Sequence, residues 1–407
     1  MIGPTVCHML GRRRVGVQHA EPSVPTSEAG LETELVQLAL RAAVHHPILK
    51  AVYLGPPQWL EDANRDPGEP EKLIAAARDL MARAAAENKL YLAGQARSIA
   101  TQLEVRQGKV LPYDQMVAQL LGVELEIPAE DEMRELQSDV TELASSLEPS
   151  GTDPVRRWEE RRQVRGEAKW DIAMRAYLAG REYVLGGRFP LKIAESLDIV
   201  RTEDDLWSVN FSWYPPKRTT FEVNVANART PEAVAFEVAH NIYPGDYLHI
   251  AVLIQHTYQR RGHVNASIKL KNAPESVVSE GIEETALLRI TPDPAPGLIL
   301  AAKLEWLRRM ASLAGAIALH LEGRSEKDVL EAMARNGFMD ESRARFQLGH
   351  VKHPLWGPYQ YTYILGRRLV QEADRRMSNR NHSAYLDYLY SGLHTPQSFL
   401  PGVDALA

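Results

Sequence analysis

Helical periodicity runs through most of this 407-residue chain and constrains its fold more than any other sequence feature. Leu31, Leu35 and Leu38 recur near the 3.6-residue period and predict a helix that ends at His45. Short segments rich in Val, Phe and Trp predict strands instead, at residues 199–201, 207–214 and 221–225. Further helices are predicted at residues 70–105, 113–121, 129–147, 154–184, 231–243, 246–261, 275–290, 298–322, 326–336 and 356–378. The fold class predicted is therefore mainly α with a small β element.

No internal repeat and no low-complexity linker divides the helical region. Residues 1–27 hold Gly, Pro, Ser and scattered charge without a period, which is typical of a flexible N-terminal tail. We therefore expect one mainly helical domain over residues 28–407. Its N-terminal half is residues 28–190, and residues 191–407 form the half that carries the chemical motifs described below.

Composition narrows the function classes. The net charge of −6 disfavours a nucleic-acid partner, because phosphate binding needs a basic surface. No segment reaches the roughly 18 apolar residues of a membrane span, so no membrane partner is expected. A single cysteine, Cys7, excludes an intramolecular disulfide and a thiolate metal site. No apolar run of signal-peptide length follows Arg12–Arg14, and we expect a cytoplasmic protein.

Two segments carry residue types that suit a metal site. Residues 240–249 read His-Asn-Ile-Tyr-Pro-Gly-Asp-Tyr-Leu-His, and residues 274–284 read Pro-Glu-Ser-Val-Val-Ser-Glu-Gly-Ile-Glu-Glu. On an unbroken helix, His240 and Asp246 would lie on different faces. Pro244 must interrupt the helix, because it lacks an N–H and clashes with the preceding turn. Such a break would bring Asp246 back beside His240.

These segments resemble a family of bacterial helical zinc metallopeptidases, largely catalogued as a domain of unknown function and similar to the gluzincins of the carboxypeptidase Taq type. Residues 240–247 are similar to the family motif H-E-x-Y-P-G-H-H, and residues 274–281 to its T-P-E-x-x-I-S-E-G block. Residues 363–367 are similar to its tyrosine-x-x-glycine helix. The resemblance covers roughly residues 190–400 and implies a gluzincin-like helical domain with a deep groove.

The resemblance implies a divalent metal ion held by His240, Asp246 and Glu280, and zinc is the metal that we expect before any other. A carboxylate is an acceptable zinc ligand but favours harder metals than a second His does. This chain departs from the family motif at three positions. The catalytic Glu is Asn241, the second metal His is Asp246 and the following His is Tyr247. An amide cannot take a proton at neutral pH, and the loss of a general base costs ~10²–10⁴ in rate.

Other residues are assigned roles by position. In the family reading Tyr363 stabilises the developing oxyanion, and Arg367 binds a substrate carboxylate. His249 is a candidate ligand or a candidate for the missing acid or base. Glu283 and Glu284 share the face of Glu280, and one of them is a candidate to orient a ligand or to replace the missing base. Asn241 and Tyr247 are expected to contact the substrate.

Each of these residues also has a purely structural interpretation. His240 would be a buried helix histidine, Asp246 a helix cap, His249 a packing residue and Tyr363 a core aromatic. The three glutamates 280, 283 and 284 would form a solvated helix face, and Arg367 would lie on the surface.

The sequence leaves two functions open. The first is a diverged metal-dependent hydrolase of peptides or small amides. The alternative is a catalytically inactive homologue that has lost the metal and binds a peptide or a partner protein. Asn241 favours the second function, whereas His240 and Glu280 favour the first.

Overall fold

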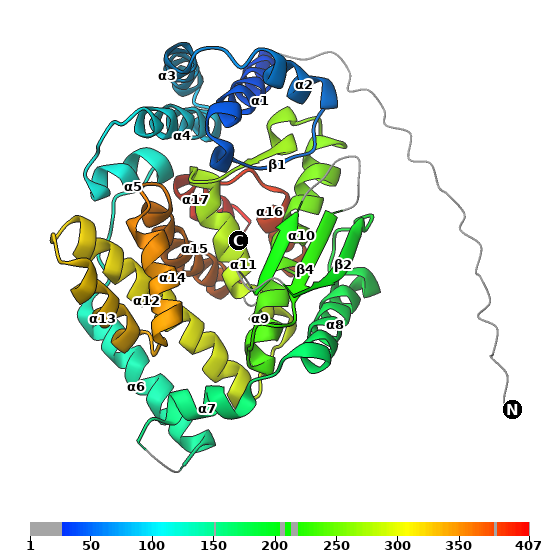
Figure 1. Cartoon of the computed structure of the whole chain (residues 1–407). Coiled ribbons are helices and arrows are strands. Elements are labelled where there is room, and N and C mark those ends of the chain that lie inside the picture. Colours follow the sequence, from blue (N-terminus) through cyan, green and yellow to red (C-terminus); the bar gives the residue numbers. More distant parts are fainter. Residues whose placement is uncertain (1–26, 150–151, 204–207, 213–218, 378–380, 407) are drawn as a thin grey trace, which may run out of the picture.

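The structure is a computed structural model, and it describes residues 27–149, 152–203, 208–212, 219–377 and 381–406. The tail predicted at residues 1–27 lies outside the described residues except for Ser27, and so do parts of the strand predicted at 207–214. Helices make up most of the described chain, and the strands form two small sheets (Figure 1). The prediction of a mainly α fold with a small β element is confirmed.

Seventeen α-helices lie within the described residues. Their bounds are α1 Ser27–His45, α2 Pro57–Arg65, α3 Pro70–Ala86, α4 Leu90–Arg106, α5 Tyr113–Leu121, α6 Glu130–Leu147, α7 Pro154–Arg162, α8 Gly166–Tyr183, α9 Pro231–Asn241, α10 Asp246–Val252, α11 Pro274–Ile290, α12 Pro296–His320, α13 Glu326–Asn336, α14 Glu341–Lys352, α15 Trp356–Met377, α16 His382–Ser391 and α17 Pro396–Asp404. None of the helices within the described ranges is both long and apolar enough to cross a membrane.

Two predicted helices are each split in two by the backbone. The helix predicted at 70–105 breaks between α3 and α4, where Asn88 adopts a left-handed φ of 56°. The helix predicted at 154–184 breaks between α7 and α8. There Val164 forms a β-bridge with Arg229, and Gly166 takes a φ of 55°. The sequence patterns of α2, α14, α16 and α17 did not predict those helices.

Within the described ranges, five strands pair in two separate sheets. β1 (Lys50–Tyr53) and β5 (Ile268–Leu270) are antiparallel, and they connect the N-terminal half to the segment that leads into α11. In the second sheet, β4 (Thr219–Asn224) lies between β2 (Leu197–Thr202), which is parallel to it, and β3 (Val209–Ser212), which is antiparallel. The second sheet leads directly into α9.

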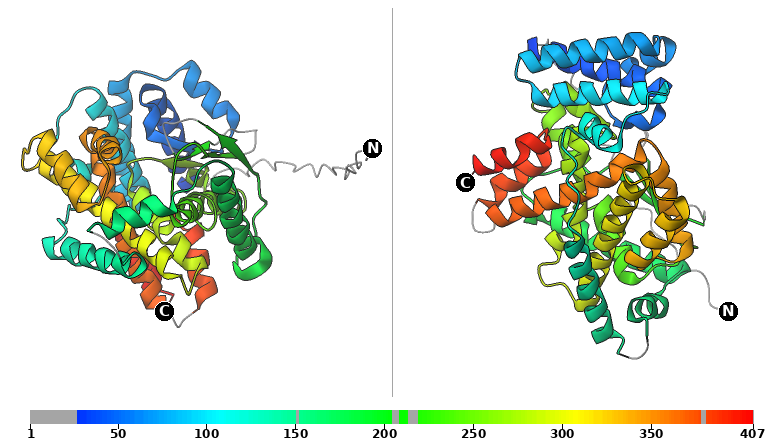
Figure 2. Two further views of the ribbon diagram at one scale, coloured as in Figure 1. Left: turned by 60° about the horizontal axis from the view of Figure 1, so that its bottom comes forward. Right: turned by 90° about the vertical axis from the view of Figure 1, so that its left-hand side faces the viewer.

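Helix α11 lies at the centre of the molecule and packs most closely against α15 (Figure 1). The two helices meet at glycines: a Cβ on Gly281 would lie 2.2 Å from the carbonyl oxygen of Gly366, so a larger residue would push the helices apart. Helices α1, α3 and α4 form a separate layer at one end of the molecule (Figure 2). This arrangement buries nearly all of α11, including its charged residues.

Candidate metal centre

His240 lies in the last turn of α9, where the chain leaves the helix. Helix α9 ends at Asn241, and α10 begins at Asp246 after Pro244 and Gly245. A Cβ at Gly245 would lie 1.7 Å from the carbonyl oxygen of His240, so only glycine fits this turn. The helix interruption predicted from Pro244 is therefore confirmed. It leaves the imidazole of His240 at the open end of its helix.

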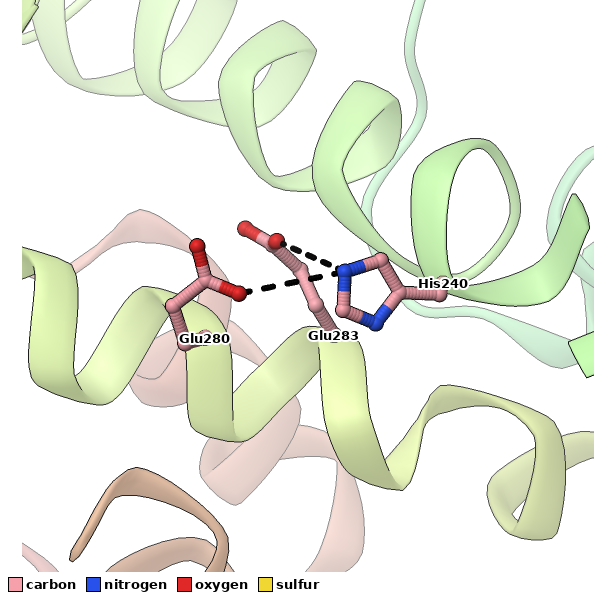
Figure 3. Close-up of side chains that lie close together, drawn as sticks. All are labelled: His240, Glu280 and Glu283. Carbon is pink, nitrogen blue, oxygen red and sulfur yellow. Dashed lines mark ion pairs between the residues drawn. The ribbon is translucent and has the colours of Figure 1, made fainter. Parts of the chain in front are cut away.

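Three glutamates of α11 face His240. Their spacing of three and four residues places Glu280, Glu283 and Glu284 on one side of the helix. They are 3%, 4% and 2% exposed, so the interpretation of a solvated face is wrong. The Nε2 atom of His240 lies 3.4 Å from Oε2 of Glu283 and 3.8 Å from Oε2 of Glu280 (Figure 3). An imidazole and two carboxylates thus converge from two helices.

These three side chains have the geometry of a metal site. Each of His240, Glu280 and Glu283 offers one ligand atom, and the three atoms lie within 4.8 Å of one another. Ligand atoms about 2.1 Å from a tetrahedral zinc are separated by about 3.4 Å. The distances of 3.4 and 3.8 Å from the imidazole nitrogen are close to that separation. The residues present fit a divalent ion with little movement.

Glu284 lies behind the imidazole, on the side away from the other two glutamates. Its Oε1 is 3.6 Å from Nδ1 of His240 and 3.3 Å from Nη2 of Arg309. A carboxylate at the second ring nitrogen fixes the tautomer of a metal-bound histidine. Glu284 is placed near Nδ1 of His240, but 3.6 Å is longer than a hydrogen bond, so its side chain must move closer to make this contact.

The predicted ligand Asp246 is not part of this group. Its Oδ1 accepts a hydrogen bond from Nζ of Lys269 at 2.6 Å, and the same ammonium donates to Oε1 of Glu283 at 3.1 Å. Burial works against ionisation, but the charges of Lys269 and Lys271 and the hydrogen bonds to the carboxylate together lower the pKa of Asp246 to about 2. Asp246 is the first residue of α10, and the N-cap position is occupied by Gly245. The structure thus gives Glu283 the position that the sequence assigned to Asp246.

Glu280 is held from its other side. Tyr359 donates a hydrogen bond to Oε1 of Glu280, and Nζ of Lys271 lies 3.5 Å from the same oxygen. Burial alone would raise the pKa of Glu280, but its neighbours, with the charge of Lys271 the largest contribution among them, together lower it. In contrast, burial and the charge of Asp246 raise the pKa of Glu283. The two carboxylates therefore differ in proton affinity although they face the same imidazole.

Sequence reasoning missed four contributors to this site. Tyr359 lies four residues before Tyr363, on the same face of α15, and that spacing would have indicated it. The sequence carries no comparable signal for the others, because strand β5 and helix α12 are brought here by tertiary packing. These residues are Lys269, Lys271 and Arg309.

His249 is buried beside this centre but does not join it. Its Nδ1 lies 3.3 Å from Oγ of Ser279, which donates to Oε1 of Glu283 at 3.0 Å. Burial and then the charge of Lys269 lower the pKa of His249 to about 3, so the ring is neutral at pH 7. A small pocket, with room for about one water, is lined by His249, Lys269 and Ser279 among others. The deep groove implied by the resemblance stays a prediction.

The two residues expected beside the substrate are tied to the protein. Nδ2 of Asn241 donates to the backbone oxygen of Glu237 at 2.7 Å, within its own helix. Tyr247 is 2% exposed in the apolar core, and its hydroxyl accepts a hydrogen bond from the amide of Ser196 at 2.6 Å. The structure therefore gives no support for a contact between Tyr247 and a substrate. Asn241 is half-buried, and its contact with a substrate stays a prediction.

Tyr363 and Arg367 follow one another by one turn on α15 and face helix α12. The guanidinium of Arg309 stacks on the Tyr363 ring at 3.7 Å, and that of Arg367 lies over the ring of Trp306 at 4.5 Å. Arg367 is 8% exposed, so the interpretation of a surface residue is wrong. Within the described part of the chain, neither the Tyr363 hydroxyl nor the Arg367 guanidinium forms a hydrogen bond. Both groups therefore have hydrogen-bonding capacity that none of the described residues uses.

Several buried polar atoms of the centre also have no hydrogen-bond partner within the described ranges. They are Nδ1 of His240, Oε2 of Glu280 and both carboxylate oxygens of Glu284. Most buried polar atoms in native proteins are hydrogen-bonded, because an unsatisfied one costs about 1–3 kcal/mol. These unpaired atoms lie close together around the imidazole of His240.

Comparison with known proteins gives the fold and no more. No protein-family model matches this chain, and no curated protein matches it in sequence. Among solved structures, the putative lipoprotein from Colwellia psychrerythraea is similar with a TM-score of 0.58 and 14% identity, over 83% of this chain and 67% of that one. A putative lipoprotein of unknown function from Shewanella oneidensis is similar with a TM-score of 0.54 and 12% identity, over 93% and 73%. At such identities the likeness shows a shared fold alone.

Proposed function

We propose that this protein is a metal-dependent hydrolase of peptides or small amides, with the ion held by His240, Glu280 and Glu283. The observation that carries the proposal is the convergence of three ligand atoms within 4.8 Å, on side chains that two helices bury together. Lys271 and Lys269 lie beside the Oε1 atoms of Glu280 and Glu283, and an ion would pair with the Oε2 atoms, which face His240. One nitrogen and two carboxylate oxygens suit zinc, manganese or iron.

A divalent ion in such a site lowers the pKa of a bound water and polarises a carbonyl group. The chain's own residues supply the remaining functions. Glu284 would orient the imidazole of His240 once its carboxylate closes the 3.6 Å gap to Nδ1. The phenol of Tyr363 donates a hydrogen bond to the carbonyl oxygen as that oxygen gains negative charge. Arg367 pairs with a carboxylate of the substrate, since its guanidinium has no carboxylate within ion-pair distance among the described residues.

The alternative function is a catalytically inactive homologue that binds a peptide or a partner protein. Asn241 favours it, because this residue stands where the resembling family has its general base, and its amide is hydrogen-bonded to Glu237 of its own helix. The two functions share the same site residues and differ in whether bound substrate is turned over.

Metal analysis of protein purified without a His-tag tests the proposal most directly. We expect about one zinc, manganese or iron per chain, and a rise in the thermal midpoint when metal is added to the stripped protein. His240→Ala should abolish both effects. His382→Ala, which changes an exposed histidine, is the matched control and should retain them. Stripped wild-type protein whose midpoint does not respond to any of the three metals would contradict the proposal.

Digestion of a peptide mixture, followed by mass spectrometry, separates the two functions. The hydrolase predicts metal-dependent cleavage by the wild-type protein, which His240→Ala abolishes. The inactive homologue predicts metal-independent peptide binding without cleavage. Asn241→Glu is informative in both cases, because cleavage that appears only in this variant shows that the base alone is missing.

A further inference from the structure

Lys269 is a buried cation that lies between two carboxylates of the candidate centre. Its side chain is 7% exposed, and its ammonium donates to Asp246 at 2.6 Å and to Glu283 at 3.1 Å. These two contacts hold the ammonium at a fixed position between the carboxylates.

The two carboxylate oxygens of Glu283 face two different cation positions. Oε1 faces the ammonium of Lys269, whereas Oε2 faces Nε2 of His240, where the proposed ion binds. Two-metal hydrolytic centres hold their cations about 3.5–4 Å apart. The carboxylate of Glu283 is placed as a bridge between two such positions, one of which is filled by Lys269.

We propose that the ammonium of Lys269 takes the place of a second divalent cation, and that removing it opens a second cation site between Asp246 and Glu283. Both ligands are carboxylates, so the class of ligand is a hard or borderline divalent cation such as manganese or zinc. Lys269 also lines the one-water pocket beside His249. A shorter side chain at position 269 would therefore leave room for an ion and its water.

The inference rests on the proposed function only through Glu283, which the two cation positions share. The contacts that define the second position, from Lys269 to Asp246 and to Glu283, do not involve His240 or Glu280. The second position is therefore testable even if no ion binds at the first.

Lys271 provides a matched control on the same segment. Its ammonium lies 3.5 Å from one carboxylate, that of Glu280, and donates to the hydroxyl of Tyr359 at 2.9 Å. Its side chain is 28% exposed, so water reaches it. Removing Lys271 takes away a positive charge of the same size without vacating a position between two carboxylates.

The experiment counts manganese ions per chain by equilibrium dialysis and elemental analysis, in full-length wild-type protein, Lys269→Ser and Lys271→Ser. We expect Lys269→Ser to bind one more ion than the wild type, and Lys271→Ser to bind the same number as the wild type. The double variant Lys269→Ser/Asp246→Asn should return to the wild-type number, since it lacks one of the two carboxylates. A Lys269→Ser protein that folds only in the presence of manganese supports the inference in the same way.

Wild-type counts distinguish failure of the two proposals. A count of zero in the wild type and one in Lys269→Ser contradicts the proposed function but supports the second cation position. Equal counts in the wild type and in folded Lys269→Ser overturn the inference, whatever the wild-type value. A gain of one ion in Lys271→Ser also overturns it, because charge removal alone would then explain the result.

Asp246→Asn keeps the charge of Lys269 and tests the inference without vacating its position. The ammonium would then pair with Glu283 alone and compete with the ion at His240 for that carboxylate. We expect manganese affinity to fall about tenfold in this variant, measured by titration of stripped protein. Unchanged affinity would mean that Lys269 does not act as a competing cation.

Discussion

Two clusters of buried charge in this molecule are built from similar residues but differ in how their atoms are satisfied. In the first, Arg308 of α12 donates to Glu305 at 2.9 Å and to both oxygens of Glu159 at 2.9 and 2.8 Å. Arg343 of α14 donates to both oxygens of Glu305 at 3.0 and 2.7 Å. In the second cluster, around His240, buried oxygens and a ring nitrogen have no hydrogen-bond partner within the described residues.

The difference indicates two purposes for buried charge. The Arg308 cluster has four charged groups that balance one another in bidentate or near-bidentate pairs, which is how a buried ionic network avoids an uncompensated charge. The His240 cluster has four carboxylates, those of Asp246, Glu280, Glu283 and Glu284. Three basic groups face them, those of Lys269, Lys271 and Arg309. The charges of the first cluster are paired by hydrogen bonds, whereas those of the second balance only if Glu283, whose pKa is raised, keeps its proton.

The largest effect is expected where the first cluster is broken. Arg308→Met should lower the free energy of unfolding by about 3–5 kcal/mol, because Glu159 and Glu305 would lose a buried partner. Denaturant unfolding measures the change. A loss below about 1 kcal/mol would show that the network is not structural and would remove the contrast between the two clusters.

Acid should affect the two clusters differently. His249 has a folded-state pKa of about 3 against 6.5 in the unfolded chain, so the unfolded state binds the proton first as pH falls. Protonation of His249 in the unfolded chain therefore destabilises the fold progressively from pH 6.5 towards pH 3, by on the order of 2–3 kcal/mol at pH 4.5. The arginines lower the pKa of Glu305 despite its burial, so its stabilisation persists in that window and is lost only below about pH 4.5.

The measurement is the free energy of unfolding of wild type and His249→Gln at pH 7 and pH 4.5. The variant should lose less stability than the wild type between the two values. His382→Gln, at an exposed position, should behave as the wild type. Equal losses in wild type and His249→Gln would show that His249 is not buried in its neutral form.

Glu284→Gln tests the second cluster, the one around His240. An amide beside Nδ1 of His240 no longer fixes the tautomer as a carboxylate does, and metal affinity should fall about 10–100-fold. Titration with manganese or zinc measures the affinity. Wild-type affinity in this variant would exclude Glu284 as the residue that orients His240.

The smallest effect on stability is expected at an exposed arginine of α14, the helix that carries Arg343. Arg345 lies two residues after Arg343 on α14, but it is 63% exposed and pairs with Glu341 one turn away. Arg345→Met should change stability by less than about 0.5 kcal/mol, since exposed pairs contribute little. Both variants remove one arginine charge, so the difference between their losses of stability under the same conditions measures the effect of burial. A loss above about 2 kcal/mol would indicate an unrecognised contact of Arg345.

The sequence by itself determined the local structure around the site. Pro244 and Gly245 fix the end of α9, because proline lacks an N–H and no side chain fits beside the His240 carbonyl. Helical spacing places Glu280, Glu283 and Glu284 on one face, so His240 and two or three glutamates were identifiable as candidates. The overall proportion of helix followed from periodicity in the same way.

Only the tertiary structure decided which of these side chains meet. The sequence paired His240 with Asp246, but strand β5 brings the Lys269 ammonium to Asp246, and Glu283 takes the position beside the imidazole. Likewise, Arg309 of α12 and Tyr359 of α15 reach the site from distant parts of the chain. The physical reason is that the charge balance of a buried site depends on every element packed around it. Local spacing fixes only the residues that share one helix.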